Sequence, residues 1–537
     1  MKHTFLLIVF CSVFLSANAQ KDVKGDSLAS DFRHMVKLLE ETHPDPYTSF
    51  GGKVFFHKQA FLLENELRKN AATLQTFFDK VSAFLSRLQD GHTYLIMPSS
   101  GQQTTQRFLP LEIRTIPEGI ILQGVPREYG HLLGSRLTAI NGHRTEEVLN
   151  RVAAMKASEN LYDRYANLSR YIRSEHFLQQ LFPEQADSVC LSLLTPDDQT
   201  CEMVLPFLPQ EEIKKTELTR NSRHPGFPTR QLEYRFVDDR KQVMQICINS
   251  IMARDNFEYM YKKGWSDLYR QMEFYYRSVI NEEMPADTLQ AIRNLKSFSE
   301  TFGQMLREMK KTKASTLIID LRNNSGGWTP ITLPVLYQLY GDRYLQKDMD
   351  MKFYRLISPL YMQKLETDLP SYNRQRGTNY AFGDYTFYNE EKEDTAGIEQ
   401  QRANFIDYCM SSNPDELRKQ QGKPLYAPKH IYVVTNDHTF SAAFHFTFYL
   451  WKMGATIVGV PSGQAPNTFM EQTLFRLPYT GLQGSISNSA QYFLTSDDKR
   501  AKTLYPDLMP TYEDYRKYKF DTQAEILYLL EERGYKN

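Results

Sequence analysis

The sequence has no net charge, few cysteines and no apolar run long enough to span a membrane. Its 64 basic and 64 acidic side chains cancel, so no global field attracts nucleic acid or an anionic membrane. The longest apolar segment near the start, residues 5–15, is shorter than the roughly twenty residues that a transmembrane helix needs. We therefore expect no nucleic-acid partner and no transmembrane segment.

Five cysteines occur in 537 residues, and only Cys190 and Cys201 lie close together, on either side of a Thr195-Pro196-Asp197-Asp198 turn. This spacing permits a hairpin disulfide in an oxidising compartment, and a pair of buried free thiols explains it equally well. No Cys/His spacing indicates a zinc site. The sequence predicts neither a metal nor an organic cofactor.

The first twenty residues have the pattern of a cleavable secretory signal. Lys2 precedes the apolar segment, and Ala17-Asn18-Ala19 precedes Gln20. We expect residues 1–19 to be removed and the mature protein to be exported, either to a periplasm or out of the cell. The remaining chain is long enough for roughly three domains of about 150 residues each.

Two smaller regions precede the predicted main domain. Residues 20–99 are expected to form a helical domain, because apolar side chains recur at helical spacing until His43-Pro44-Asp45-Pro46 interrupts it. These side chains are Leu28, Phe32, Met35, Val36 and Leu39. Residues 100–210 are expected to form a small β-rich binding module, with a strand over residues 119–125, a turn at Asn141-Gly142 and a helix over residues 145–155.

Residues 211–537 are predicted to form an α/β domain with a mostly parallel sheet. Strand-like runs at 243–249, 315–320 and 430–435 are separated by helical stretches, as parallel strands joined by crossover helices require. Residues 343–428 interrupt this pattern as a polar insertion with little periodicity.

Two turns that follow predicted strands contain the main candidates for chemistry. Ser441 opens an apolar helical run, where the helix dipole favours a nucleophile and a developing oxyanion. A serine in that position is also an ordinary helix N-cap. Gly326 and Gly327 could offer bare backbone N–H groups to an oxyanion, or could serve only a tight turn. Because ligands bind at the carboxyl ends of such strands, we interpret the two turns as halves of one active site.

A serine nucleophile needs a base, and three histidines are candidates. His445 lies one helical turn after Ser441, but Phe444, Phe446 and Phe448 around it indicate a core position. His438 precedes Ser441 and could simply shape the turn. His92 lies in Asp90-Gly91-His92-Thr93 at the end of a helical run, where it could project into a cleft.

At these residues the chain resembles the carboxyl-terminal processing, or tail-specific, serine peptidases, including their tricorn-core branch. The resemblance rests on residues 317–327, residues 435–443, residues 455–463 and Tyr505-Pro506-Asp507. It implies a crotonase-like α/β core with an N-terminal helical part. It also implies a PDZ-like module, of which residues 133–142 look like the latter part.

The resemblance implies Ser441 as nucleophile, with an oxyanion hole formed by the Ala442 N–H and the N–H of Gly326 or Gly327. The best-known members use a lysine about twenty-five residues after the serine, but no lysine occurs here between Lys452 and Lys499. A Ser-Lys dyad is therefore excluded. The tricorn-like branch takes a histidine from the N-terminal helical region, and His92 stands at that place.

The carboxylate that would orient His92 stays open at this point. The glutamate expected shortly before the terminal Pro-Asp falls near Arg500, where Asp497 and Asp498 are close substitutes and Asp90 is a local option. Val460, Gln464 and Phe444 also depart from the family pattern.

The resulting hypothesis is an exported serine endopeptidase that cleaves polypeptides, acting near their C-termini, by a Ser-His acyl-enzyme mechanism. The first alternative is a catalytically inactive protein that binds peptides or hydrophobic ligands on the same fold. The second is an interaction protein that docks through the module and the insertion.

Overall fold

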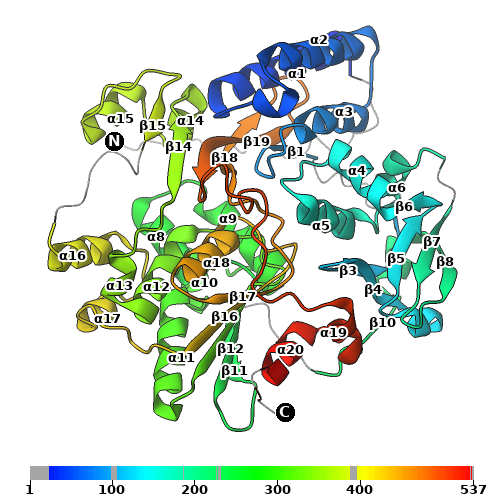
Figure 1. Cartoon of the computed structure of the whole chain (residues 1–537). Coiled ribbons are helices and arrows are strands. Elements are labelled where there is room, and N and C mark those ends of the chain that lie inside the picture. Colours follow the sequence, from blue (N-terminus) through cyan, green and yellow to red (C-terminus); the bar gives the residue numbers. More distant parts are fainter. Residues whose placement is uncertain are drawn as a thin grey trace.

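The computed structural model describes residues 23–97, 106–184, 187–224, 226–227, 232–387, 396–532 and 534 (Figure 1). The predicted leader, residues 1–19, lies outside them. Within the described ranges no helix has both the length and the apolar character needed to cross a bilayer. The chain is a mixed α/β fold with several sheets.

The N-terminal region is helical, as predicted. Its helices are α1 (Gly25–Thr42), α2 (Lys53–Lys69) and α3 (Leu74–Ser86). The predicted apolar stripe of α1 is buried or partly buried in one core. That core also takes Phe475, Leu482 and Ile486 from a distant hairpin. Strand β1 (Tyr94–Ile96) then pairs with this hairpin. The helical region is therefore attached directly beside the His92 turn.

The predicted module contains a sheet of seven strands, in the order β10-β4-β5-β7-β8, with β3 on β4 and β6 on β5. Its elements are β3 (Glu112–Ile116), β4 (Gly119–Pro126), β5 (Arg136–Ile140), β6 (His143–Arg144), α4 (Thr145–Met155), α5 (Leu161–Tyr171), α6 (Glu175–Leu181), β7 (Ser188–Leu194), β8 (Thr200–Pro206) and β10 (Leu218–Arg220). The short strands β2 (Arg107–Phe108) and β9 (Leu208–Pro209) pair beside it, followed by α7 (Gln210–Ile213). The predicted strand, turn and helix of this module are confirmed.

A disulfide between Cys190 and Cys201 does not form, and both thiols are free. The hairpin register explains why. Cys190 lies opposite Val204, whereas Cys201 lies opposite Leu193. Positions 190 and 193 project from opposite faces of β7, because side chains alternate along a strand. The alternative of free thiols is therefore the correct one.

The main domain is built on a five-stranded sheet in the order β11-β12-β13-β16-β17. The strands are β11 (Glu233–Phe236), β12 (Val243–Cys247), β13 (Thr316–Asp320), β16 (His430–Thr435) and β17 (Thr456–Gly459). All pairings are parallel except that of edge strand β11. Cys247, Asp320 and Val434 are in register, so the loops that follow these strands leave from the same edge of the sheet.

Helices cover both faces of this sheet. One face packs on α11 (Phe298–Thr312), α12 (Leu333–Tyr340) and α18 (Ala442–Lys452), and the other on α20 (Ala524–Glu532). The domain also contains α8 (Arg254–Lys263), α9 (Leu268–Tyr275), α10 (Thr288–Asn294) and α19 (Tyr512–Lys517).

The insertion at 343–428 has regular structure that its sequence did not predict. It contains β14 (Lys352–Leu356), α14 (Pro359–Lys364), α15 (Leu369–Arg376), β15 (Tyr385–Phe387), α16 (Ile398–Tyr408) and α17 (Pro414–Lys419), and α13 (Asp342–Leu345) leads into it. Strand β14 pairs with β19 (Gln483–Tyr492), which also pairs with β1 and β18 (Asn467–Arg476). This second sheet joins the insertion to the N-terminal region.

Candidate active site

The two predicted turns meet at the carboxyl edge of the core sheet. The Asn436 side chain accepts a hydrogen bond from the Asn323 N–H at 2.9 Å and donates one to the Asn323 side chain. The Phe440 N–H donates to the Asn324 carbonyl, also at 2.9 Å. These contacts join the glycine turn to the segment that carries Ser441.

Ser441 has a strained backbone between β16 and α18. Its φ of 52° and ψ of −125° lie in a region that L-residues rarely adopt, at a cost of about 1–3 kcal/mol. The serine side chain makes no N-cap hydrogen bond, so the simple capping interpretation is wrong. Instead the buried Gln464 side chain accepts a hydrogen bond from the Ser441 N–H. The turn is therefore held by its surroundings, with Ser441 Oγ free of the helix.

His92 provides the partner of Ser441 Oγ. Its Nε2 lies 3.2 Å from Oγ, although the residues are 349 positions apart. Its Nδ1 lies 3.1 Å from the carbonyl oxygen of Phe469. A carbonyl can only accept a hydrogen bond, so Nδ1 carries the proton and Nε2 has a free lone pair. The neutral ring is thereby held in the tautomer that can take a proton from the serine.

Asp90 lies behind the histidine as a buried charge. It accepts hydrogen bonds from the His92 N–H at 2.8 Å, from His43 Nε2 at 3.2 Å and from the Thr93 hydroxyl. Burial alone would raise the pKa of Asp90, but its hydrogen bond and charge interaction with His43, then the nearby His92 and Thr93, lower it to about 2. Asp90 is thus an ionised carboxylate.

The Asp90 carboxylate also faces the ring of His92. One of its oxygens lies 4.0 Å from His92 Nδ1. Burial lowers the pKa of His92, and the Asp90 charge opposes this effect only in part. The imidazole is therefore neutral at rest and has an anion close by when it becomes charged.

The structure does not place Asp497 or Asp498 at His92. Asp498 accepts hydrogen bonds from the Arg500 side chain within its own turn, and Asp497 is exposed. The Arg500 guanidinium packs on the ring of Trp451 in α18, 5.3 Å from its centre. The prediction that one of these aspartates orients the imidazole is therefore not supported by the geometry. Instead the Phe469 carbonyl accepts the hydrogen bond from His92 Nδ1, and Asp90 is the carboxylate near this nitrogen.

The glycine turn lies directly against Ser441. A Cβ on Gly326 would fall 2.6 Å from Ser441 Cβ and 2.9 Å from the Ala442 nitrogen, and one on Gly327 would fall 2.3 Å from the Ile251 carbonyl oxygen. Both residues also have positive φ, 106° and 142°. The turn therefore requires glycine at both positions, whatever else it does.

The predicted oxyanion donors differ in availability. The Gly326 N–H already donates to Asn324 Oδ1 at 2.9 Å. Gly327 forms a parallel bridge with Ile251. In this bridge the Ile251 N–H donates to the Gly326 carbonyl, and the Trp328 N–H donates to the Ile251 carbonyl. The Gly327 N–H takes no part in these two hydrogen bonds. Ala442 is the first residue of α18, where N–H groups have no partner within the helix. The N–H groups of Gly327 and Ala442 are thus the two that these contacts leave available.

The other two histidines have different roles. His445 is buried, with Nδ1 2.8 Å from Thr329 Oγ1 and Nε2 2.7 Å from Gln491 Oε1. Burial lowers its pKa to about 4, which confirms a core histidine. His438 Nε2 lies 3.2 Å from Ser169 Oγ on α5, so it contacts the module. Burial lowers the pKa of His438 as well.

Glu159 also lies at the site, although no pattern in the sequence predicts it. It is buried in the loop between α4 and α5. Burial, followed by the charges of Asp163 and Asp90, raises its pKa well above the ordinary value. Asp90, His92 and Glu159 each offer a ligand atom within 4.8 Å of the others. Because these atoms already make hydrogen bonds to the protein, we assign no metal to them.

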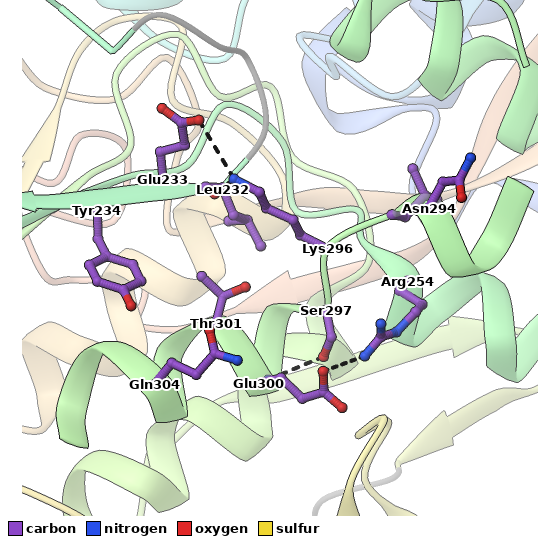
Figure 2. Close-up of a pocket in the computed structure, with 11 residues that line it drawn as sticks. Leu232, Glu233, Tyr234, Arg254, Asn294, Lys296, Ser297, Glu300, Thr301 and Gln304 are labelled. Atoms are coloured by element: carbon purple, nitrogen blue, oxygen red, sulfur yellow. Dashed lines mark hydrogen bonds and ion pairs between the residues drawn. The ribbon is translucent and has the colours of Figure 1, made fainter. Parts of the chain in front are cut away.

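A separate polar pocket lies at the edge strand β11 and the start of α11 (Figure 2). Arg254 pairs there with Glu300, and Lys296 Nζ lies 3.6 Å from Glu233 Oε1. Its lining includes neither Ser441 nor His92. Its charges are neutralised within the pocket, and it does not belong to the Ser441 site.

Comparisons with known proteins support the same class of chemistry. Residues 290–507 match peptidase family S41. This match identifies the protein as a serine-type peptidase, a hydrolase. The matched segment covers less than half of the chain and contains Gly326, Gly327 and Ser441, but not His92. No curated protein matches the chain.

Two solved structures resemble this fold over most of the length of the chain. Mature CPAF complexed with lactacystin aligns with 94% of this chain and 98% of its own, at 14% identity and a TM-score of 0.54. Another crystal structure of mature CPAF aligns with 95% of this chain and 98% of its own, at the same identity and TM-score. Likeness at this identity shows a shared fold.

Proposed function

We propose that this S41 peptidase hydrolyses peptide bonds of polypeptides, with Ser441 as nucleophile and His92 as general base. The observation that carries the proposal is the 3.2 Å contact between His92 Nε2 and Ser441 Oγ, with Nδ1 held on the Phe469 carbonyl. The strained backbone of Ser441 adds support, because strain of this kind concentrates at functional sites.

In the proposed reaction Ser441 Oγ attacks the peptide carbonyl carbon while His92 Nε2 takes the hydroxyl proton. The carbonyl π electrons move to oxygen, and the Gly327 and Ala442 N–H groups bind the oxyanion. The ionised Asp90 stabilises the imidazolium. His92 then protonates the leaving amine, which leaves an acyl-serine. Water hydrolyses this ester with His92 again as base.

Finer features of the proposal rest on sequence patterns. We propose that the enzyme is an exported endopeptidase that acts near polypeptide C-termini. We also propose that it belongs to a tricorn-like branch without the catalytic lysine, and that it has a crotonase-like core and a PDZ-like module. The pattern over residues 1–19 supports a location in a periplasm or outside the cell. We place the domains at 20–99, 100–210 and 211–537.

The alternative of an inactive binding protein is not favoured, because the unusual residues have structural roles. Gln464 accepts a hydrogen bond from the Ser441 N–H and so supports the nucleophile turn. Val460 is buried, and its carbonyl accepts a hydrogen bond from the Thr435 hydroxyl at 2.9 Å. Phe444 stacks on Phe493 in a core cluster. None of these contacts blocks the Ser441 hydroxyl.

The test is digestion of an unstructured polypeptide, with the products identified by mass spectrometry. The wild-type chain should release internal fragments, and Ser441→Ala should release none above background. Intact polypeptide after incubation with well-folded wild type would contradict the proposal. Cuts confined to the last residues of the substrate would support action near C-termini, and scattered cuts would oppose it.

A further inference from the structure

Glu159 reaches from the module into the surroundings of the proposed site. The loop between α4 and α5 carries it, on the side of the module that faces the rest of the chain (Figure 1). Its Oε1 accepts a hydrogen bond from the Gly91 N–H at 3.3 Å, and its Oε2 accepts one from the Ala465 N–H at 2.9 Å. The Thr468 side chain also hydrogen-bonds this carboxyl group.

Each of these three contacts lies next to a part of the Ser441–His92 pair. Gly91 directly precedes His92. Ala465 follows Gln464, whose side chain accepts the Ser441 N–H. Thr468 precedes Phe469, whose carbonyl accepts the His92 Nδ1 proton. A single carboxyl group therefore connects the histidine turn, the segment that supports the nucleophile and the strand that sets the histidine tautomer.

The loop that carries Glu159 is itself fixed to the main domain. Asp163 Oδ2 accepts the Glu159 N–H at 3.0 Å, and Asn160 Nδ2 donates to the Ser462 carbonyl at 3.1 Å. A Cβ on Gly463 would lie 3.2 Å from Asp163 Cα, and one on Gly91 would lie 3.3 Å from Glu159 Oε1. Both glycines therefore lie in close contact with this loop.

We infer that Glu159 is a positioning residue, by which the module holds His92 and Ser441 in reacting geometry. This inference rests on the proposed function. Glu159 makes no contact with the Ser441 hydroxyl, so its effect is transmitted through Gly91, Ala465 and Thr468. A displacement of about 1 Å at a reacting group can lower a rate by about a hundredfold. The module would then be part of the catalytic unit and not only a binding appendage.

The first arm of the test measures the rate of fluorophosphonate labelling in the full chain. Glu159→Ala removes all three contacts and should lower the labelling rate by about ten- to a hundredfold. Glu159→Gln keeps one acceptor oxygen and nearly the same shape and should recover most of that loss. Glu159→Leu fills similar space without an acceptor and should not, which distinguishes positioning by hydrogen bonds from a role in space-filling. Exposed Glu146 in the first turn of α4 provides the matched control, and Glu146→Ala should label like wild type.

The second arm does not depend on activity. Hydrogen exchange of the Gly91 and Ala465 amides should speed up in Glu159→Ala and stay slow in Glu146→Ala. Unchanged exchange at both amides, or wild-type labelling by Glu159→Ala, would overturn the inference. If the wild type does not label at all but the two amides still exchange faster in Glu159→Ala, the result would contradict the proposed function and not the role of Glu159. The two failures are therefore distinguishable.

Discussion

Two buried histidines near Ser441 differ in what surrounds them. His92 is 5% exposed and His445 is 2% exposed, so burial does not separate them. His445 has both ring nitrogens occupied by the neutral side chains of Thr329 and Gln491. His92 has one nitrogen on a backbone carbonyl, the other on Ser441 Oγ, and the Asp90 carboxylate 4.0 Å away. The partners of the ring, and not its distance from the serine along the chain, distinguish a base from a core residue.

The largest expected effect separates these two histidines. His92→Ala should lower kcat/KM for peptide hydrolysis by about two to four orders of magnitude, because proton transfer contributes that much. His445→Ala should instead lower the melting temperature, since the buried Gln491 Oε1 and the partly buried Thr329 hydroxyl lose their contacts with the ring, at a cost of about 1–3 kcal/mol. Its activity per folded molecule should stay within a few-fold of wild type. The reverse pattern in these two variants would refute the assignment.

The glycine turn should show the next largest effect. Gly326→Ala places a methyl group against Ser441 Cβ and the Ala442 nitrogen, so it should disturb both the nucleophile and an oxyanion donor. Loss of one such donor lowers kcat by about two to three orders of magnitude.

Gly377 is the matched control for Gly326. It also has positive φ, 65°, but a Cβ there would meet nothing within 4 Å. Gly377→Ala should therefore affect stability alone, and kinetics with thermal melts on both variants decide between the outcomes. Equal loss of activity in both would mean that backbone strain, and not contact with Ser441, explains the effect.

Asp90 should have a smaller effect with a defined sign. Its charge raises the pKa of His92 against the lowering effect of burial. Asp90→Asn removes that charge, so the pKa of His92 should fall. Because the reaction needs neutral His92, the acid limb of kcat/KM should move to lower pH. The plateau rate should also fall, since the imidazolium loses its nearby anion. An acid limb that moves to higher pH would contradict this account of the site.

Local patterns predicted the parts of the site that lie close together in sequence. The strands at 316–320 and 430–435, the glycine turn and the serine turn each follow from hydrophobic periodicity and turn residues. Their meeting at one sheet edge follows from parallel strand order. His92 needed the family resemblance as well, because its own segment is one glycine-flanked turn among many.

The parts that the sequence did not predict depend on backbone atoms or on distant pairing. The group that fixes His92 is the Phe469 carbonyl, which every residue type possesses, so no sequence pattern marks it. The assignment to Asp497 or Asp498 relied on distance along the chain, and the Arg500 turn places them elsewhere. Strand β14 of the insertion is stabilised by pairing with β19, more than a hundred residues later, which local periodicity cannot indicate.

The most direct test of the central claim is fluorophosphonate labelling with the modified residue located by peptide mass spectrometry. Wild type and His57→Ala, a change on the outer helix α2, should carry the adduct on Ser441. Ser441→Ala should carry none, and His92→Ala should label at least a hundredfold more slowly, as expected for loss of the base. Wild-type protein that is folded but unlabelled, or equal labelling in His92→Ala, would contradict activation of Ser441 by His92.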